Sequence, residues 1–175
     1  MNNQTNFERI FLLENLPKGI NRSDEHLQIF ENFLEKTRFC LRKIRSPKTN
    51  KYSFILEQKF PIEEKDLSVW NSSEIYLNQT EYEVFENNHG QSNELRFNRY
   101  FYDYQSKKVN IDIYLGELKG LILARISFDT FAEMQDFEMP VLAKVEVTQN
   151  KFFTDKNLIG KSFAEIQNEF DKESK

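Results

Sequence analysis

Four cationic side chains on strand-like segments could bind an anion. Arg42, Lys59, Arg99 and Arg125 each share a strand face with the residue two positions away, because successive side chains of a strand point to opposite faces. Arginine and lysine are the usual partners of phosphate oxygens. Each cation alone is more often a solvated surface residue than a ligand contact, so its meaning depends on the elements that carry it.

Other catalytic patterns do not occur in the sequence. The single cysteine, Cys40, excludes an internal disulfide and a cysteine-based zinc site, and we expect it to be a small buried side chain. His26 and His89 have no Ser-His-Asp or metal-ligand spacing around them, and we expect both at the surface. Gly116 and Gly120 flank turns and lack a phosphate-loop pattern.

Composition narrows the class of protein. The 175 residues fit one domain spanning residues 1–175, long enough to bury roughly two-thirds of the unfolded surface. The net charge of −4 and the sequence pI near 5.4 give no general attraction to nucleic acid or anionic membrane, so we expect neither as a partner. No apolar run of signal-peptide length precedes the first charged residues, which predicts a cytoplasmic location. The oligomeric state stays open.

Alternating apolar and polar residues predict a chain made largely of strands. The segment from Asn6 to Leu13 alternates, and Gln105-Ser106-Lys107 is short enough to join two long strands as a hairpin. Further strand signals lie at residues 38–45, 52–60, 74–77, 95–104, 108–115 and 121–128. About eight mostly antiparallel strands would avoid exposed edges by curling into a barrel. We therefore expect an α+β fold, a largely antiparallel closed eight-stranded β-barrel with peripheral helices.

Four helices are expected around these strands. Ser23 can cap a helix to about Lys36, because Leu27, Phe30 and Leu34 fall at helical spacing. The other three begin at capping boxes, formed by Thr80 with Glu83, Thr130 with Glu133, and Ser162 with Glu165.

The order of several short motifs resembles the CYTH domain family, the triphosphate tunnel metalloenzymes, from about Asn6 to Leu158. The closest stretch is NIDIYLGELKGLILA, residues 110–124, after which the family's Ala-Glu-x-Glu-Phe becomes Ala-Arg-Ile-Ser-Phe, with Arg125 and Ser127 at the acidic positions. The Glu-x-Glu-x-Lys of the family's first strand becomes Asn6, Glu8 and Ile10. The remaining motifs place Cys40 and Arg42 on Arg-x-Arg, Glu57 and Lys59 on Thr-x-Lys, Ser72, Glu74 and Tyr76 on Arg-x-Glu-x-Glu, and Phe97 and Arg99 on Lys-x-Arg.

This resemblance implies a site inside the barrel. Family members, among them class IV adenylyl cyclases and thiamine triphosphatases, bind a triphosphate in the tunnel with Mg²⁺ or Mn²⁺ held by acids. Carried over by position, the ligand-binding residues are Arg42, Lys59, Arg99 and Arg125, and the metal ligands are Glu8, Glu74 and Asp112. The acids expected at Asn6, Arg125 and Ser127 are replaced. An arginine among metal ligands opposes a bound dication, and we interpret Arg125 equally as a ligand contact or as an ion-pair partner of Glu8 or Asp112.

Three functional hypotheses follow from this pattern. The preferred one is a diverged tunnel protein that binds a triphosphate, a nucleotide or another small anion, with metal-dependent hydrolysis weak or lost. A second is an active Mg²⁺- or Mn²⁺-dependent triphosphatase or adenylyl cyclase with a rearranged site formed by Glu8, Glu57, Glu74, Asp112 and Glu146. A third is a non-catalytic structural or interaction barrel. Inward charges would support ligand binding, whereas an interior filled by aromatic side chains would support a structural role.

Overall fold

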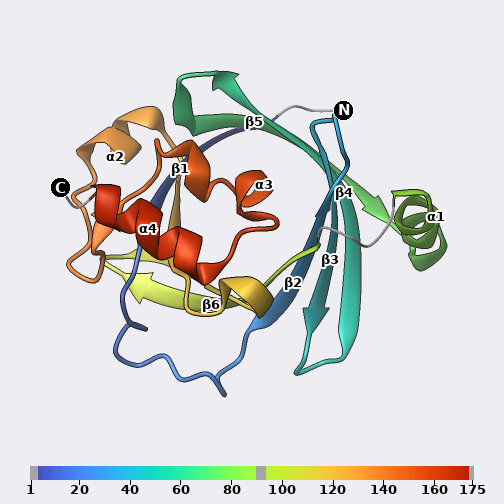
Figure 1. Ribbon diagram of the computed structural model, residues 1–175, viewed down its shortest axis with the longest axis horizontal. Helices are drawn as coiled ribbons and strands as arrows, with labels where there is room; N and C mark the ends of the chain where they lie inside the picture. The colour runs from blue at the N-terminus through green and yellow to red at the C-terminus, as the bar shows by residue number, and fades with distance from the viewer. Residues whose placement is uncertain (1–3, 90–93, 174–175) are drawn as a thin grey trace.

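The computed structural model describes residues 4–89 and 94–173. Strands are the commonest secondary structure in these ranges, with helices between and after them (Figure 1). The strands are β1 (Gln4–Leu12), β2 (Leu27–Phe33), β3 (Phe39–Ser46), β4 (Lys51–Glu63), β5 (Asp66–Leu77), β6 (Glu94–Tyr104), β7 (Lys107–Tyr114), β8 (Ile122–Phe128) and β9 (Val145–Glu146). The α-helices are α1 (Gln79–His89), α2 (Phe131–Asp136), α3 (Asp155–Leu158) and α4 (Phe163–Glu173), and the 3₁₀ helices are η1 (Gly116–Leu118) and η2 (Lys151–Phe153).

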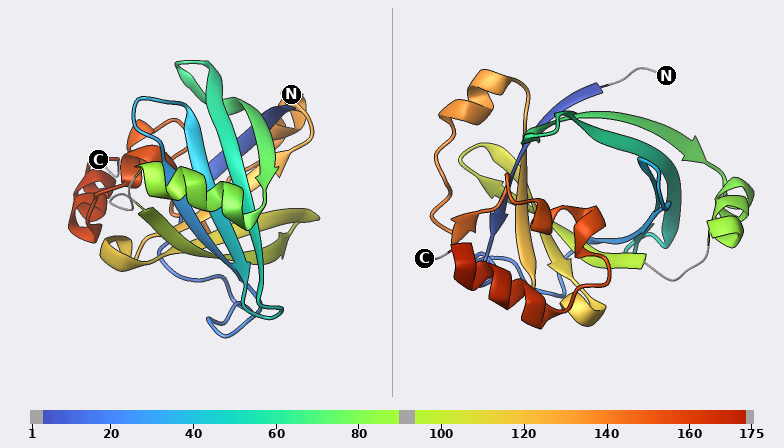
Figure 2. Two further views of the ribbon diagram at one scale, coloured as in Figure 1. Left: turned by 90° about the vertical axis from the view of Figure 1, so that its right-hand side faces the viewer. Right: turned by 45° about the horizontal axis from the view of Figure 1, so that its top comes forward.

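Eight of these strands close into an antiparallel barrel. Their order is β5-β4-β3-β2-β6-β7-β8-β1, and β1 also pairs with β5, so that the two ends of the row join. The short β9 pairs with β1 outside this ring. Figure 2 shows the strands curving round a common interior, with α1 on one side and α2 and α4 on the other. Closure leaves none of the eight strands as an open edge, and the predicted α+β barrel is confirmed.

The predicted helix over residues 23–36 is wrong, because this segment forms β2. The spacing of Leu27, Phe30 and Leu34 fits a helix, but Leu27 and Ile29 also alternate with polar neighbours as a strand requires. The segment pairs with β3 on one side and with β6 on the other. Ladder hydrogen bonds on both edges outweigh a weak local helical pattern. The consequence for the interior is that Glu31 of β2 faces the same side as Arg42 of β3.

The expected turns and helix starts are largely confirmed. Gln105 and Ser106 have positive φ in the turn of the predicted β6–β7 hairpin. The box of Ser162 with Glu165 forms. Thr130 Oγ1 accepts from the Glu133 amide as expected, but the Glu133 side chain accepts from the Asp129 amide. The box of α1 lies two residues earlier than expected: Asn78 Oδ1 accepts from the Glu81 amide at 3.0 Å, and the Glu81 side chain accepts from the Asn78 amide at 2.8 Å. Within the described ranges, no helix is long and apolar enough to cross a membrane.

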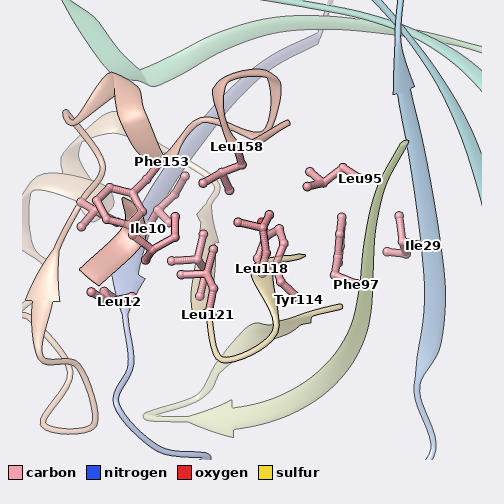
Figure 3. Packing of buried hydrophobic residues seen from close by; sticks show 13 residues of the cluster. Ile10, Leu12, Ile29, Leu95, Phe97, Tyr114, Leu118, Leu121, Phe153 and Leu158 are labelled. Atoms are coloured by element: carbon pink, nitrogen blue, oxygen red, sulfur yellow. The ribbon is translucent and has the colours of Figure 1, made fainter. Parts of the chain in front are cut away.

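The barrel interior has an apolar end and a charged part. Figure 3 shows the apolar end, where Phe97 and Tyr114 pack with Phe153 and Leu158 from the C-terminal segment. Phe153 and Leu158 are 1% and 0% exposed, so η2 and α3 belong to the core although they are very short. This C-terminal segment fills one end of the barrel with apolar atoms. The inward side chains beyond this apolar end are predominantly polar and charged.

Candidate functional site

The inward-facing charged residues contact one another in two groups. Both groups contain residues that the sequence singled out together with residues that it did not. We name them the Arg125 cluster, formed by Glu8, Lys59, Arg99, Asp112, Arg125 and Asp155, and the Arg42 cluster, formed by Glu31, Arg42, Glu57 and Glu74.

Arg125 is the centre of the first cluster, and its side chain is 4% exposed. Its Nε lies 3.0 Å from Asp112 Oδ2, its Nη2 2.5 Å from Asp155 Oδ1, and its Nη1 3.5 Å from Glu8 Oε1. Nη2 also donates to the Tyr114 hydroxyl at 3.1 Å, and that hydroxyl donates to Asp155 Oδ1 at 2.9 Å. Each nitrogen of the guanidinium therefore faces a different carboxylate, and the two partners expected for Arg125 are both present.

Arg99 and Lys59 complete this cluster. Arg99 is bidentate with Asp112, with Nε to Oδ1 and Nη2 to Oδ2 both at 2.7 Å. Lys59 Nζ lies 3.6 Å from Glu8 Oε1 and 4.9 Å from the centroid of the Trp70 ring. Three carboxylates therefore face three cations, and the Arg125 cluster has no net charge when all six groups are ionised.

Two acids of the Arg125 cluster, Glu8 and Asp155, have lowered pKa values and are held in their ionised form. Burial alone would raise the pKa of Glu8, but Lys59 and Arg125 outweigh it and lower that pKa. Burial opposes ionisation of Asp155 in the same way, and Arg125 and then Lys59 lower its pKa. Burial also raises the pKa of the Tyr114 hydroxyl, which therefore stays protonated and keeps its hydrogen bond to Asp155.

The Arg42 cluster carries more acid than base. Arg42 Nη2 lies 2.7 Å from both Glu31 Oε1 and Glu57 Oε2, and Nη1 lies 3.9 Å from Glu74 Oε1. Glu57 and Glu74 are directly opposite one another on β4 and β5. Glu31 is 2% exposed, and its Oε2 has no hydrogen-bond partner among the described residues. Burial raises the pKa of Glu31, even though Arg42 acts in the opposite direction.

A pocket of about 260 Å³ lies beside both clusters. Its charged lining residues are Glu8, Glu57, Lys59 and Glu74. Its neutral polar lining includes Ser127, one of the positions at which the resemblance leads us to expect an acid. The pocket thus adjoins both clusters, and the buried residues Arg125 and Asp112 do not line it.

The remaining sequence candidates lie outside this site or take no part in it. Cys40 is buried at 3% exposure, and burial raises the pKa of its thiol, so it behaves as a small apolar residue. His26 is half-buried and stacks on Tyr100 with ring centroids 5.0 Å apart. The His89 side chain lies outside the described part of the chain. Glu146 pairs with Arg9, so the structure does not bring it to the Arg125 cluster.

The residues present do not fit a divalent metal ion. Among the residues that the structure describes, no group of three or more acidic, histidine or cysteine side chains is placed to hold one. Both oxygens of Asp112 already accept from Arg99, and Oδ2 also accepts from Arg125. Glu74 contacts the other cluster, at Arg42. Glu8, Glu74 and Asp112, the expected metal ligands, therefore do not converge on one point.

Sequence reasoning missed two acids of the site. Glu31 was not predicted as a site residue because its segment matched a helical pattern. Its strand register places it opposite Arg42. Asp155 follows η2 on a helix of four residues, and its position depends on the packing of Phe153 and Leu158 into the barrel end. Glu57 was named from the sequence at the threonine of the Thr-x-Lys motif and as part of the rearranged metal set. The strand alternation of β2 was the one sequence signal that could have indicated Glu31.

Comparison with known proteins identifies a similar fold. No protein-family model matches the chain, and no curated protein sequence matches it. Among solved structures, the inorganic triphosphatase NE1496 matches with a TM-score of 0.57 and 21% identity over 87% of this chain and 93% of that chain. A second structure, of the hypothetical protein NE1496, gives a TM-score of 0.59 and 21% identity over 90% and 99%. Together with the closed eight-stranded barrel, these matches show that the chain has a CYTH-like fold, the fold of an inorganic triphosphatase.

Proposed function

We propose that the barrel binds a small phosphorylated or otherwise anionic ligand in the pocket, and that metal-dependent hydrolysis is weak or lost. The observation that carries this proposal is a set of cationic donors not fully used by the carboxylates. Lys59 is 32% exposed and has one acidic contact, at 3.6 Å. In the described ranges, Nη1 of Arg42 and of Arg125 donates no hydrogen bond. These nitrogens lie 3.9 Å from Glu74 and 3.5 Å from Glu8, two acids that line the pocket, although neither arginine lines it.

These donors suit an oxyanion better than a neutral ligand. Charge-assisted hydrogen bonds from lysine and arginine are the strongest contacts that a protein can offer to phosphate oxygens. Asn6, Ser72 and Ser127 add neutral polar groups to the pocket wall. The fold shared with an inorganic triphosphatase supports the same class of ligand, although the likeness by itself concerns the fold alone.

The loss of hydrolysis is proposed from the engagement of Asp112. Metal-assisted hydrolysis needs carboxylate oxygens that are free to hold the ion, and the ion then lowers the pKa of the attacking water. Asp112 is 0% exposed and its two oxygens accept from Arg99 and Arg125. An anion can therefore be held here by the remaining donors without the chemistry that would cleave it.

The acid excess of the Arg42 cluster makes this binding depend on pH. An anion in the pocket is repelled by Glu57 and Glu74, and Glu31 holds part of the Arg42 guanidinium. The raised pKa of Glu31 means that it takes up a proton more readily than an ordinary glutamate as pH falls. Protonation removes one negative charge beside Arg42, so affinity for the anion should rise from neutral to mildly acidic pH.

The test is calorimetry and thermal stabilisation with tripolyphosphate, combined with phosphate release in Mg²⁺ or Mn²⁺ on the same samples. The Lys59→Met variant should weaken tripolyphosphate binding by roughly tenfold to a hundredfold, the effect of losing one charge-assisted contact. Lys48→Met is the matched control. The Lys48 side chain is 66% exposed, forms an ion pair with Glu25 and does not line the pocket. This variant should leave binding unchanged.

The possible results separate the hypotheses. Stabilisation without phosphate release, weakened by Lys59→Met alone, supports the proposal. Metal-dependent phosphate release that disappears in Asp112→Asn would refute the loss of hydrolysis and support the active-enzyme hypothesis. Absence of any response to tripolyphosphate or ATP would refute anion binding and favour a structural barrel.

A further inference from the structure

We infer that the guanidinium of Arg125 is a resident cation that takes the place of a divalent metal ion in this barrel. The carboxylates that it holds become a divalent-cation site when the guanidinium is removed. This inference concerns the free protein, and it stands whether or not the pocket takes a phosphorylated ligand.

The first support is the convergence of acids from distant parts of the chain on one cation. Glu8 comes from β1, Asp112 from β7 and Asp155 from α3. Each contacts a different nitrogen of Arg125, at 3.5, 3.0 and 2.5 Å. Carboxylates gathered from separate elements around one buried positive centre are the arrangement by which proteins hold Mg²⁺ and Mn²⁺. Here the positive centre is part of the chain.

The second support is the charge balance of the cluster. With Lys59 and Arg99, Arg125 neutralises the three acids, and five of the six side chains are no more than 24% exposed. A dication added to this cluster would bring two uncompensated charges into a poorly solvated interior. Such charges are costly to desolvate, and their repulsion by three nearby cations adds to that cost. The Arg125 cluster of the native protein therefore disfavours a bound dication.

The third support is the incomplete bonding of Glu8. Its Oε1 is a buried atom without a hydrogen-bond partner among the described residues, and its two cationic neighbours, Lys59 Nζ and Arg125 Nη1, lie at 3.6 and 3.5 Å. A guanidinium anchored by Asp112 and Asp155 does not reach this third acid at hydrogen-bond distance. Removing the guanidinium frees Glu8 and Asp155 for an ion in the vacated space, and Asp112, which still accepts from Arg99, lies beside them.

The experiment measures Mn²⁺ binding to free protein through loss of the free-ion electron paramagnetic resonance signal, with melting curves in EDTA and in Mn²⁺. Wild type should bind no Mn²⁺ in the barrel and melt at the same temperature in both solutions. Arg125→Met should melt well below wild type in EDTA, bind one Mn²⁺, and recover much of the lost melting temperature in Mn²⁺. Adding Asp155→Asn to Arg125→Met should abolish both the binding and the recovery.

The control is Arg9→Met. Arg9 also pairs with a carboxylate through two nitrogens, but its partner Glu146 lies outside both clusters, and removing it leaves one acid alone. This variant should lose stability without gaining Mn²⁺ binding.

Three results would overturn the inference. One is a Mn²⁺ ion bound by wild type and lost on Asp112→Asn. Another is a folded Arg125→Met protein that takes up no Mn²⁺. The third is an Arg125→Met protein that fails to fold with and without Mn²⁺, since an occupied site should restore the fold. Folding of this variant only in Mn²⁺ would support the inference.

Discussion

Replacing Glu31 by glutamine should stabilise the protein, although it removes a member of a buried ion pair. Arg42 faces three carboxylates, so it can lose one and remain paired with Glu57. The hydrogen bond from Arg42 Nε to Glu31 Oε1, at 2.8 Å, can persist to the glutamine carbonyl. The glutamine amide is also much less costly to bury than a carboxylate with an unpartnered oxygen.

The magnitude follows from two opposing terms. Exchanging a charged acceptor for a neutral one costs about 1 kcal/mol in the remaining hydrogen bond. Replacing the charged carboxylate by a neutral amide gains about 1–3 kcal/mol, because an unsatisfied charged group costs more to bury than an unsatisfied neutral one. The net expectation is a gain of about 1 kcal/mol, which corresponds to a rise of about 2–4 °C in melting temperature for a domain of this size.

The pH dependence of stability gives a second, independent test of the stabilisation expected from Glu31→Gln. Because the pKa of Glu31 is raised above 4.5, the folded state binds this proton more tightly than the unfolded state. Wild type therefore loses stability relative to Glu31→Gln as pH rises from 4.5 through the folded pKa, and the difference vanishes at lower pH. Urea unfolding followed by circular dichroism from pH 4.5 to neutral pH measures this difference.

The control is Glu25→Gln, in which the replaced carboxylate is 61% exposed and pairs with Lys48. It should change stability by less than about 0.5 kcal/mol at every pH, as surface ion pairs do. The reasoning fails if Glu31→Gln is less stable than wild type at neutral pH. It also fails if the difference between the two proteins does not change with pH.

Three further perturbations test the packing around the barrel. Phe153→Ala should cost about 3–5 kcal/mol in urea unfolding, because Phe153 is 1% exposed in the apolar end of the barrel. Gly120→Ala should cost more than Gly19→Ala, since both have positive φ but only the first would place Cβ 2.7 Å from the Phe163 ring; equal thermal shifts would contradict this. The Cys40 thiol should react with a disulfide reagent far more slowly than an exposed thiol, and at an ordinary rate in urea, because burial raises its pKa.

The sequence predicted the barrel well where strand patterns are local. Residues 95–104 and 108–115 alternate clearly and join through a short turn, and they form β6 and β7 as expected. The helix prediction for residues 23–36 was wrong because three apolar residues at helical spacing were given more weight than the strand alternation, which also includes Glu31. A charged residue at an inward position contradicts the usual pattern of a half-buried strand, and only pairing with β3 and β6 reveals its place.

The candidate site was predictable only in part, for a related reason. Arg42, Lys59, Arg99 and Arg125 could be placed together because each lies in an alternating strand and the family resemblance puts these positions inside the barrel. Asp155 lies on α3, and no periodicity links this helix to the barrel interior. Its approach to Arg125 is set by contacts between segments that are distant in sequence, and such contacts leave no local signal.

The double role of β1 in closing the ring affects the order in which a ribosome can complete this protein. β1 is made first, yet its partners are β5 and β8, and the last residue of β8 that it pairs with is Phe128. Until then the apolar residues Ile10 and Leu12 of the nascent chain have no barrel in which to be buried. Pairing across such a separation is slow, and a waiting apolar strand is prone to aggregate. We therefore expect chains stalled before Phe128 to bind chaperones strongly, and chains extended beyond Leu158 to be released from them.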